Sequence, residues 1–525
     1  MKRFLLTLLI ITCAVATRAQ KNLTLLGSVS FPGQSLAGCW RYVDNTGHNY
    51  ALVGVSNALA IVDIQNPAAP VVLQSIPGVS SIWREVKVYS HYAYATTEGT
   101  GPVGEQGVLI VDLSSLPGTC AYKYYNGDGA IAGQLITAHT VQATDGYLYI
   151  NGSNIANGGV VICDLNIDPW NPTFVGMYDD FYCHDSYVYN DTLWASEILA
   201  GKFSIIDITN KSNPVFINDQ ITPGQFNHNG WLSDNKQVFF TTDEINGEPL
   251  ASYDVSNVNN IQLLDEYLTD TFPNDEVHNV RVLNDYLICP SYGSQITIVD
   301  AARPDNLIET ANYPTGNFLC WDADPYLPNG NIIASDMYSS TLYIFSPTYV
   351  RGCYLEGNVT DSLTNFPING STIEILLTPK TENSNLLGNY KTGTADAGTY
   401  TIRCSQPGYY TQTVAGVQLQ NGVLTTLDFK LVPIGFGIEE PEQGVVQVYP
   451  NPFNSQTQIT LNKNINQAQI ITNIYDVAGR LVRTQMFNKL SAPSVIKRGN
   501  LSSGAYTMEV VAGEKIIARE KLIVE

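Results

Sequence analysis

The sequence predicts an all-β protein: a seven-bladed β-propeller closed by its own N-terminal strand, followed by two small β-sandwich domains. One observation is compositional, because 31 tyrosines and 42 glycines in 525 residues favour short strands and turns. The other is a repeated apolar strand that ends in aspartate. Asp63 and Asp300 lie five repeats apart, a period of roughly 47 residues, and units of roughly 40–50 residues are typical of propeller blades. The repeated aspartates are Asp63, Asp112, Asp164, Asp207, Asp254 and Asp300.

The N-terminus is expected to supply the last strand of the ring. A seventh copy at residues 341–345 keeps the apolar strand but lacks the aspartate, and the pattern stops near Tyr349 before an outermost strand. Residues 23–33 resemble residues 71–78, the outermost strand of the first repeat. We therefore expect the N-terminal strand to complete the last blade, because this removes an exposed sheet edge.

Two further β units follow the propeller, which we assign to residues 20–350. Residues 351–433 contain alternating segments typical of the strands of a small sandwich. Residues 434–444, with three glutamates, are interpreted as a linker. Residues 445–525 form the third β unit.

Residues 1–19 have the pattern of a secretory signal peptide. Lys2 and Arg3 precede an apolar run, and Ala19 is the small residue before the cleavage point. No later stretch is long and apolar enough to span a bilayer, so we expect an exported chain in a compartment that permits disulfides. The formal net charge of −21 argues against nucleic acid as a partner, because phosphate binding requires a basic face.

Four histidines fall in register when the repeats are aligned on their second strand. His139, His184 and His278 each lie nine residues before the aligned position, and His228 lies eleven residues before it. The first strand of each blade lines the central channel, where side chains from neighbouring blades converge. The predicted ring is Trp40, Arg84, His139, His184, His228, His278 and Trp321.

Carboxylates occur at the end of several second strands, which return to the same mouth of the channel. Neutral imidazoles with carboxylates are ligands for a divalent metal such as Zn, Mn or Fe. An alternative is structural: the histidines bond backbone carbonyls in the channel. The candidate metal ligands are His139, His184, His228, His278, Glu197 and Asp243, and Glu197 or Asp243 is also the candidate catalytic base. The candidate ligand contacts at the mouth are Trp40, Arg84, Trp321, Glu98, Glu244 and Asp336.

The cysteines suggest two disulfides. Cys39 and Cys320 each precede a predicted ring tryptophan, in blades that would be neighbours. A disulfide between them would clamp the ring, with an entropic stabilisation of about 4–5 kcal/mol. Cys353 and Cys404 are candidates for a second disulfide within the sandwich.

Three family resemblances lie on separate segments. The repeats, with Leu-Ile-Val-Asp at residues 109–112 and Ile-Val-Asp at 298–300, resemble the LVIVD-repeat propellers of the choice-of-anchor B family. Gly-Asn-Val-Thr-Asp at 357–361 and Asp-Ala-Gly-Thr-Tyr at 396–400 resemble carboxypeptidase regulatory-like domains. Tyr-Pro-Asn-Pro-Phe at 449–453 is similar to the type A sorting domains of Bacteroidota type IX secretion.

The third resemblance implies a location. It implies passage through the outer membrane, engagement of the type IX secretion machinery by residues 445–525, removal of that domain and attachment to surface lipopolysaccharide. We therefore expect a protein at the cell surface or outside the cell. Our first hypothesis is a non-catalytic protein that binds a surface or extracellular ligand or partner at the channel mouth, and the alternative is a metal-dependent surface enzyme.

Overall fold

The computed structural model describes most of the chain. The predicted signal peptide and all but the first residue of the predicted linker lie outside the described residues. The described residues form two compact units, one through Val432 and one from Pro433, and each is considered by itself. The described residues are 20–434 without 103, 271–273, 294 and 315–318, and 445–525 without 463–468, 488–492 and 514.

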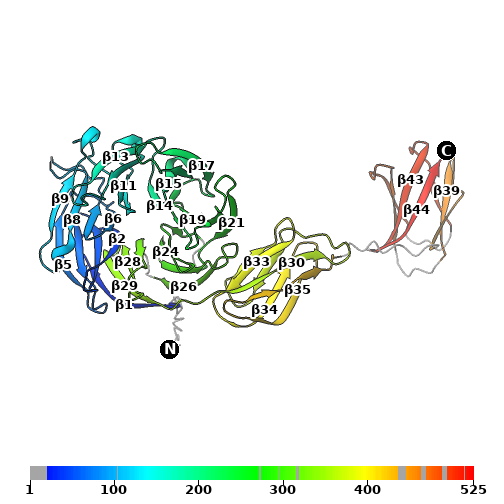
Figure 1. The fold of residues 1–525 in the computed structure, drawn as a ribbon. Coiled ribbons are helices and arrows are strands. Elements are labelled where there is room, and N and C mark those ends of the chain that lie inside the picture. Colours follow the sequence, from blue (N-terminus) through cyan, green and yellow to red (C-terminus); the bar gives the residue numbers. More distant parts are fainter. Residues whose placement is uncertain are drawn as a thin grey trace, which may run out of the picture. The chain divides into compact units, whose positions relative to one another are not determined.

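The first unit begins with seven successive sheets, which Figure 1 shows around a ring. The first sheet contains β2 (Leu36–Val43), β3 (Asn49–Val55), β4 (Ala58–Asp63) and β5 (Val71–Pro77). The second contains β6 (Val86–Tyr89), β7 (Tyr92–Ala95), β8 (Val108–Asp112) and β9 (Ala121–Tyr125). The third contains β10 (Thr140–Thr144), β11 (Tyr147–Asn151), β12 (Val160–Asp164) and β13 (Thr173–Tyr178). The fourth contains β14 (Asp185–Tyr189), β15 (Thr192–Glu197), β16 (Lys202–Asp207) and β17 (Val215–Ile221).

The remaining sheets of the ring keep this order. The fifth contains β18 (Asn227–Leu232), β19 (Val238–Asp243), β20 (Leu250–Asp254) and β21 (Gln262–Tyr267). The sixth has its first strand in two pieces and contains β22 (Glu276–Val277), β23 (Arg281–Leu283), β24 (Tyr286–Tyr292), β25 (Gln295–Asp300) and β26 (Ile308–Pro314). The seventh contains β27 (Cys320–Asp324), β28 (Ile332–Asp336), β29 (Thr341–Pro347) and β1 (Leu23–Ser30). Among the described residues, four short 3-10 turns lie in the connections of the second, third and fourth sheets: η1 (Leu113–Ser115), η2 (Gly129–Ile131), η3 (Ala156–Gly158) and η4 (Ile198–Ala200).

The N-terminal strand pairs with the last repeat, as the sequence suggested. β1 runs antiparallel to β29, from Leu23 opposite Pro347 to Ser30 opposite Thr341. It is therefore the outermost strand of a sheet whose other members come from residues 320–347.

The apolar strand of the repeat is buried on both faces, which explains its composition. In β4, Leu59 and Ile61 pack in a cluster with Val86 of the second sheet. Ala60 and Val62, on the opposite face, pack in a cluster with Ile344 of the seventh. Successive residues of a strand point to opposite faces, so a strand between two neighbouring sheets must be apolar at every position.

The aspartate that ends this strand is a turn residue. Asp63, Asp207 and Asp254 each accept a hydrogen bond from the backbone N–H two residues later, the bond that favours aspartate in turns. The repeated phrase therefore builds the scaffold.

The second domain packs on the sixth sheet through the same kind of aspartate. Asp300 accepts hydrogen bonds from the Arg351 guanidinium at 2.7 Å, the Gly352 N–H at 2.7 Å and the Tyr354 hydroxyl at 2.5 Å. Its carboxylate is fully buried. These bonds fix residues 351–354 as they leave the ring.

The second domain is a sandwich of two sheets around the core of Leu355, Ile373, Ile402 and Phe429. The first sheet contains β30 (Cys353–Asp361), β33 (Asn389–Thr394), β36 (Leu424–Thr426) and β37 (Phe429–Leu431). The second contains β31 (Thr372–Ile375), β32 (Thr381–Asn383), β34 (Gly398–Ser405) and β35 (Gln412–Leu419).

The second unit is also a two-sheet β domain, with a core that includes Ile459, Ile474, Met508 and Leu522. One sheet contains β38 (Val446–Tyr449), β39 (Gln456–Leu461) and β42 (Ser494–Lys497). The other contains β40 (Ile470–Tyr475), β41 (Leu481–Phe487), β43 (Gly504–Ala512) and β44 (Lys515–Val524). The predicted all-β class is confirmed.

The prediction of two disulfides, Cys39 with Cys320 and Cys353 with Cys404, is wrong, because all four thiols are free and buried. Cys39 packs in the cluster between the first and seventh sheets, whereas Cys320 packs in the cluster that joins the seventh sheet to the sixth. The two side chains therefore lie on opposite faces of the seventh sheet. Cys353 and Cys404 share the sandwich core as unjoined apolar side chains.

Asp265, on β21 beside the sandwich, should make the free energy of unfolding depend on pH. Burial raises the pKa of Asp265 to about 6, against hydrogen bonds from the Leu307 and Glu266 backbone that lower it. A folded-state pKa above the unfolded value means that stability falls as the pH rises from about 4 to about 6. We expect Asp265→Asn to stabilise the chain by about 1–3 kcal/mol at pH 7.5 and by less at pH 5. Thermal unfolding of the full chain at both pH values measures this, and an equal shift at both contradicts it.

Candidate ligand site at the histidine row

Four histidines from four consecutive sheets stack side by side. The ring centroids of His139 and His184 are 4.0 Å apart, those of His184 and His228 are 4.2 Å apart, and those of His228 and His278 are 4.0 Å apart. Trp321 continues the series at 4.9 Å from His278. The structure thus brings together the histidines that the sequence alignment placed in register, and we call His139, His184, His228 and His278 the histidine row.

Backbone carbonyls of the next sheet orient the row. Nδ1 of His184 is 3.1 Å from the His228 carbonyl oxygen, and Nδ1 of His278 is 2.7 Å from the Trp321 carbonyl oxygen. A carbonyl only accepts, so in these two rings Nδ1 carries the proton. In His184 this leaves the Nε2 lone pair free.

Carboxylates and a phenol surround the row. His139 Nδ1 is 2.6 Å from Glu98 Oε1. His278 Nε2 is 2.7 Å from the Tyr292 hydroxyl and 3.7 Å from Glu244 Oε1. Glu98 and Glu244, both predicted at this mouth, therefore lie at the histidine row.

Burial keeps the central imidazoles neutral. It lowers the pKa of His184, His228 and His278 well below the ordinary value, and the neighbouring histidines lower the pKa of His184 and His228 further. Burial also raises the pKa of Glu244, while His139 acts in the opposite direction. Neutral imidazole is the form that binds metals.

Three side chains have ligand atoms close enough together that they could hold a metal ion. The ligand atoms of His184, His228 and Glu244 all lie within 4.8 Å of one another. Within the described part of the chain, this is the single group of histidine, cysteine and carboxylate side chains with such spacing.

Three predicted carboxylates do not reach the row, which corrects their assignment. Counting from the aligned residue of each second strand, Glu98 and Glu244 occupy the fifth position after it, whereas Glu197, Asp243 and Asp336 occupy the fourth. Successive residues of a strand point to opposite faces, so the fourth position points away from the face of the fifth. In the sixth sheet, Tyr292 is the fifth residue after the aligned Leu287. The same count would therefore have identified Tyr292 as a neighbour of the histidine row.

These three carboxylates have structural partners instead. Glu197 accepts a hydrogen bond from the Tyr178 hydroxyl at 2.9 Å and lies 3.5 Å from the Lys202 ammonium. Asp243 accepts bonds from the Thr222 hydroxyl and the Gly224 and Phe226 N–H groups, which fixes the loop before β18. Asp336 accepts a bond from the Ser339 N–H. Neither Glu197 nor Asp243 is placed as a ligand or base at the histidine row.

Trp40 is also displaced from its predicted position, because the turn between the first two strands of the first sheet is longer: Arg41 pairs with Ala51, ten residues later, whereas Ala143 pairs with Leu148, five residues later. Second-strand hydroxyls donate to the ring-position carbonyl of the next sheet: Thr96 to His139 and Thr242 to His278. In the same way, Ser335 donates to Ala37. Ala37 therefore occupies the ring position, and Trp40 lies three residues further along β2.

Arg84 has the predicted position but a different direction. Its guanidinium donates to the carbonyls of Val55 and Val79, and the side chain is buried. It braces the connection between the first two sheets and does not contact the histidine row.

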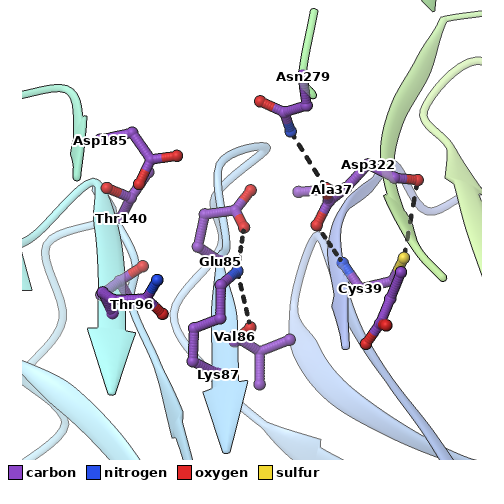
Figure 2. Close-up of polar contacts among 12 residues, drawn as sticks. Ala37, Cys39, Glu85, Val86, Lys87, Thr96, Thr140, Asp185, Asn279 and Asp322 are labelled. Carbon is purple, nitrogen blue, oxygen red and sulfur yellow. Dashed lines mark hydrogen bonds and ion pairs between the residues drawn. The ribbon is translucent and has the colours of Figure 1, made fainter. Parts of the chain in front are cut away.

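A layer of polar side chains, which the sequence alignment did not consider, follows the row by one residue. Glu85 accepts a bond from the Trp321 indole N–H at 2.8 Å and lies 3.7 Å from the Lys87 ammonium. Asn279 donates to Asp322 at 3.2 Å. Figure 2 shows the ion pair of Glu85 with Lys87 and the hydrogen bond of Asn279 with Asp322.

Aromatic and cationic side chains pack further along the first strands. Tyr326 lies 6.1 Å from both Trp40 and Trp231, measured between ring centroids. The Arg41 guanidinium lies over Tyr326 at 4.8 Å, and the Lys87 ammonium lies over Trp40 at 4.4 Å.

Comparisons with known families match three segments. The model of the secretion system C-terminal sorting domain matches residues 447–525, and that of the carboxypeptidase regulatory-like domain matches residues 354–432. The LVIVD repeat matches residues 47–76 and 199–221, which lie in the first and fourth sheets. No curated protein matches the chain.

These matches identify domains and repeats within the chain, and the sorting domain indicates the location of the protein. Among the described residues, no helix has the length and hydrophobicity needed to cross a bilayer. The chain therefore contains LVIVD repeats, a carboxypeptidase regulatory-like domain and a type IX sorting domain, and the sorting domain implies export to the cell surface or the extracellular space.

Proposed function

We propose that residues 20–350 form a seven-bladed propeller closed by β1, joined to a sandwich at 351–433 and to the sorting domain at 445–525. The closure is supported by two contacts between the last and first sheets. Ser335 donates to Ala37 as Thr96 does to His139, and the Cys39 N–H donates to Asp322. The seventh sheet therefore contacts the first in the way other successive sheets contact each other.

The function we propose is that of a cell-surface protein that binds a ligand at the histidine row. The observation that carries it is the convergence of four imidazoles, two carboxylates and a phenol at one end of the channel. Trp40, Tyr326 and Trp231 pack against one another further along the first strands, away from this cluster.

The enzymatic alternative relies on Glu197 or Asp243 as the base, and both carboxylates have other hydrogen-bond partners. Glu197 and Asp243 hold Tyr178 and the loop before β18, respectively. Ligand binding needs no such base, and it is therefore the function that the geometry supports better.

Trp321 provides the test, because its ring lies 4.9 Å from His278. The full chain is titrated with zinc chloride, citrate, glucuronic acid and N-acetylglucosamine while tryptophan emission is recorded. We expect at least one probe to change the emission of the native chain and of Trp170→Phe, a control in the third sheet, but not of Trp321→Phe. The proposal fails if no probe changes the emission or if the change persists in Trp321→Phe.

A further inference from the structure

We infer that the ligand at the histidine row is a divalent transition metal ion, bound by His184, His228 and Glu244. This inference rests on the proposed ligand site and names the chemistry of its ligand. It differs from the ligand set that the sequence suggested, because Glu244 replaces Glu197 and Asp243.

The spacing of the three ligand atoms suits one ion. They lie within 4.8 Å of one another, and a tetrahedral ion with bonds of ~2.0–2.2 Å separates its ligands by ~3.3–3.6 Å. Small side-chain rotations close the difference. Glu244 is the residue best able to move, because its side chain is 28% exposed whereas both histidines are buried.

The surrounding hydrogen bonds are those that metal sites use to orient histidines. A metal-bound histidine donates its other ring N–H to a carbonyl or carboxylate, which fixes the ring and its tautomer. His184 has such a bond to the His228 carbonyl oxygen. Nδ1 of His228 is buried and has no hydrogen-bond partner among the described residues, so the orienting bond is present in His184 alone of the two histidine ligands.

The two outer histidines have other roles. Both nitrogens of His278 are engaged, Nδ1 by the Trp321 carbonyl and Nε2 by the Tyr292 hydroxyl. His139 is held by Glu98 at 2.6 Å. We therefore assign them as positioning residues that fix the two ends of the stack, and the ion keeps open coordination positions.

The donor set selects the class of ion. Two neutral imidazoles and one carboxylate suit Zn, Mn or Fe, whereas Ca and Mg prefer sites built from oxygen ligands.

The test is the metal content of the full chain, purified, stripped with a chelator and titrated calorimetrically with zinc chloride. We expect one zinc per native chain. We expect the double variant His184→Ala with His228→Ala to lose this binding, and Glu244→Gln to weaken it by at least tenfold. The matched control is His48→Ala with His91→Ala, which removes the two remaining histidines of the chain and should keep the native stoichiometry.

Several results would overturn the inference. These are no binding of zinc, manganese or iron by the native chain, native affinity in the double variant, or native affinity in Glu244→Gln. Glu244→Gln guards against a folding artefact, since it changes a partly exposed side chain without removing a buried ring. If only an organic probe changes Trp321 emission, the proposed ligand site stands and the metal inference fails.

Discussion

Deletion of residues 445–525 is expected to abolish the appearance of the protein at the cell surface. The sorting domain matches residues 447–525 and belongs to a compact unit that begins at Pro433, so its removal leaves the packing of the first unit unchanged. The truncated protein should therefore fold but remain in the periplasm. Antibody labelling of intact cells, compared with labelling after lysis, measures the surface fraction.

A matched transfer experiment controls for misfolding of the truncated chain. Residues 434–525 fused to an unrelated exported reporter should bring that reporter to the surface. Equal surface labelling of the truncated and complete proteins would contradict the prediction, and so would a fused reporter that stays inside while the complete protein is displayed.

Arg281→Ala is expected to destabilise the ring by about 3–5 kcal/mol, because it leaves a buried carboxylate unpaired. The Arg281 guanidinium lies 2.9 Å from Asp322, and the two side chains are 2% and 0% exposed. The guanidinium also donates to Asn229 at 3.2 Å. All six tryptophans lie between residues 40 and 321, so tryptophan emission during guanidinium unfolding reports on the ring alone.

Lys391→Ala is the control for loss of a cation. Lys391 pairs with Asp305 at 2.5 Å, and the side chains are 41% and 37% exposed, so water screens the pair and the expected loss is below about 1 kcal/mol. Replacing both partners, Arg281→Met with Asp322→Leu, should recover part of the stability lost in Arg281→Ala. A loss in Arg281→Ala no larger than that in Lys391→Ala would show that the buried pair is not a determinant of stability.

The fold and the histidine row could be predicted because both depend on local periodicity. A strand buried between two sheets is apolar along its whole length, and its turn needs aspartate, so the repeat is visible in the sequence. Aligning the repeats placed His139, His184, His228 and His278 at one level, and their rings are 4.0–4.2 Å apart in the structure. Glu98, Glu244 and Trp321 followed from the same alignment.

The errors at the site came from features that a repeat alignment does not resolve. The sequence favoured Asp243 as a metal ligand, whereas its neighbour Glu244 lies at the histidine row. Adjacent residues of a strand point to opposite faces, so an error of one residue selects the wrong side chain. A longer turn between β2 and β3 moved Trp40 and placed Ala37 at the ring. Cys39 and Cys320 belong to neighbouring sheets, yet they pack on opposite faces of the seventh.

The sequence by itself determined the repeat, the sorting domain and the residues that share a level in the ring, since each is written in short, contiguous patterns. Only the tertiary structure decided which of these side chains meet. The partners of His278 show why: Trp321, Tyr292 and Glu244 come from different strands of three sheets. Their contacts depend on bulges, strand direction and the closing of neighbouring sheets, which are properties of packing between segments distant in the chain.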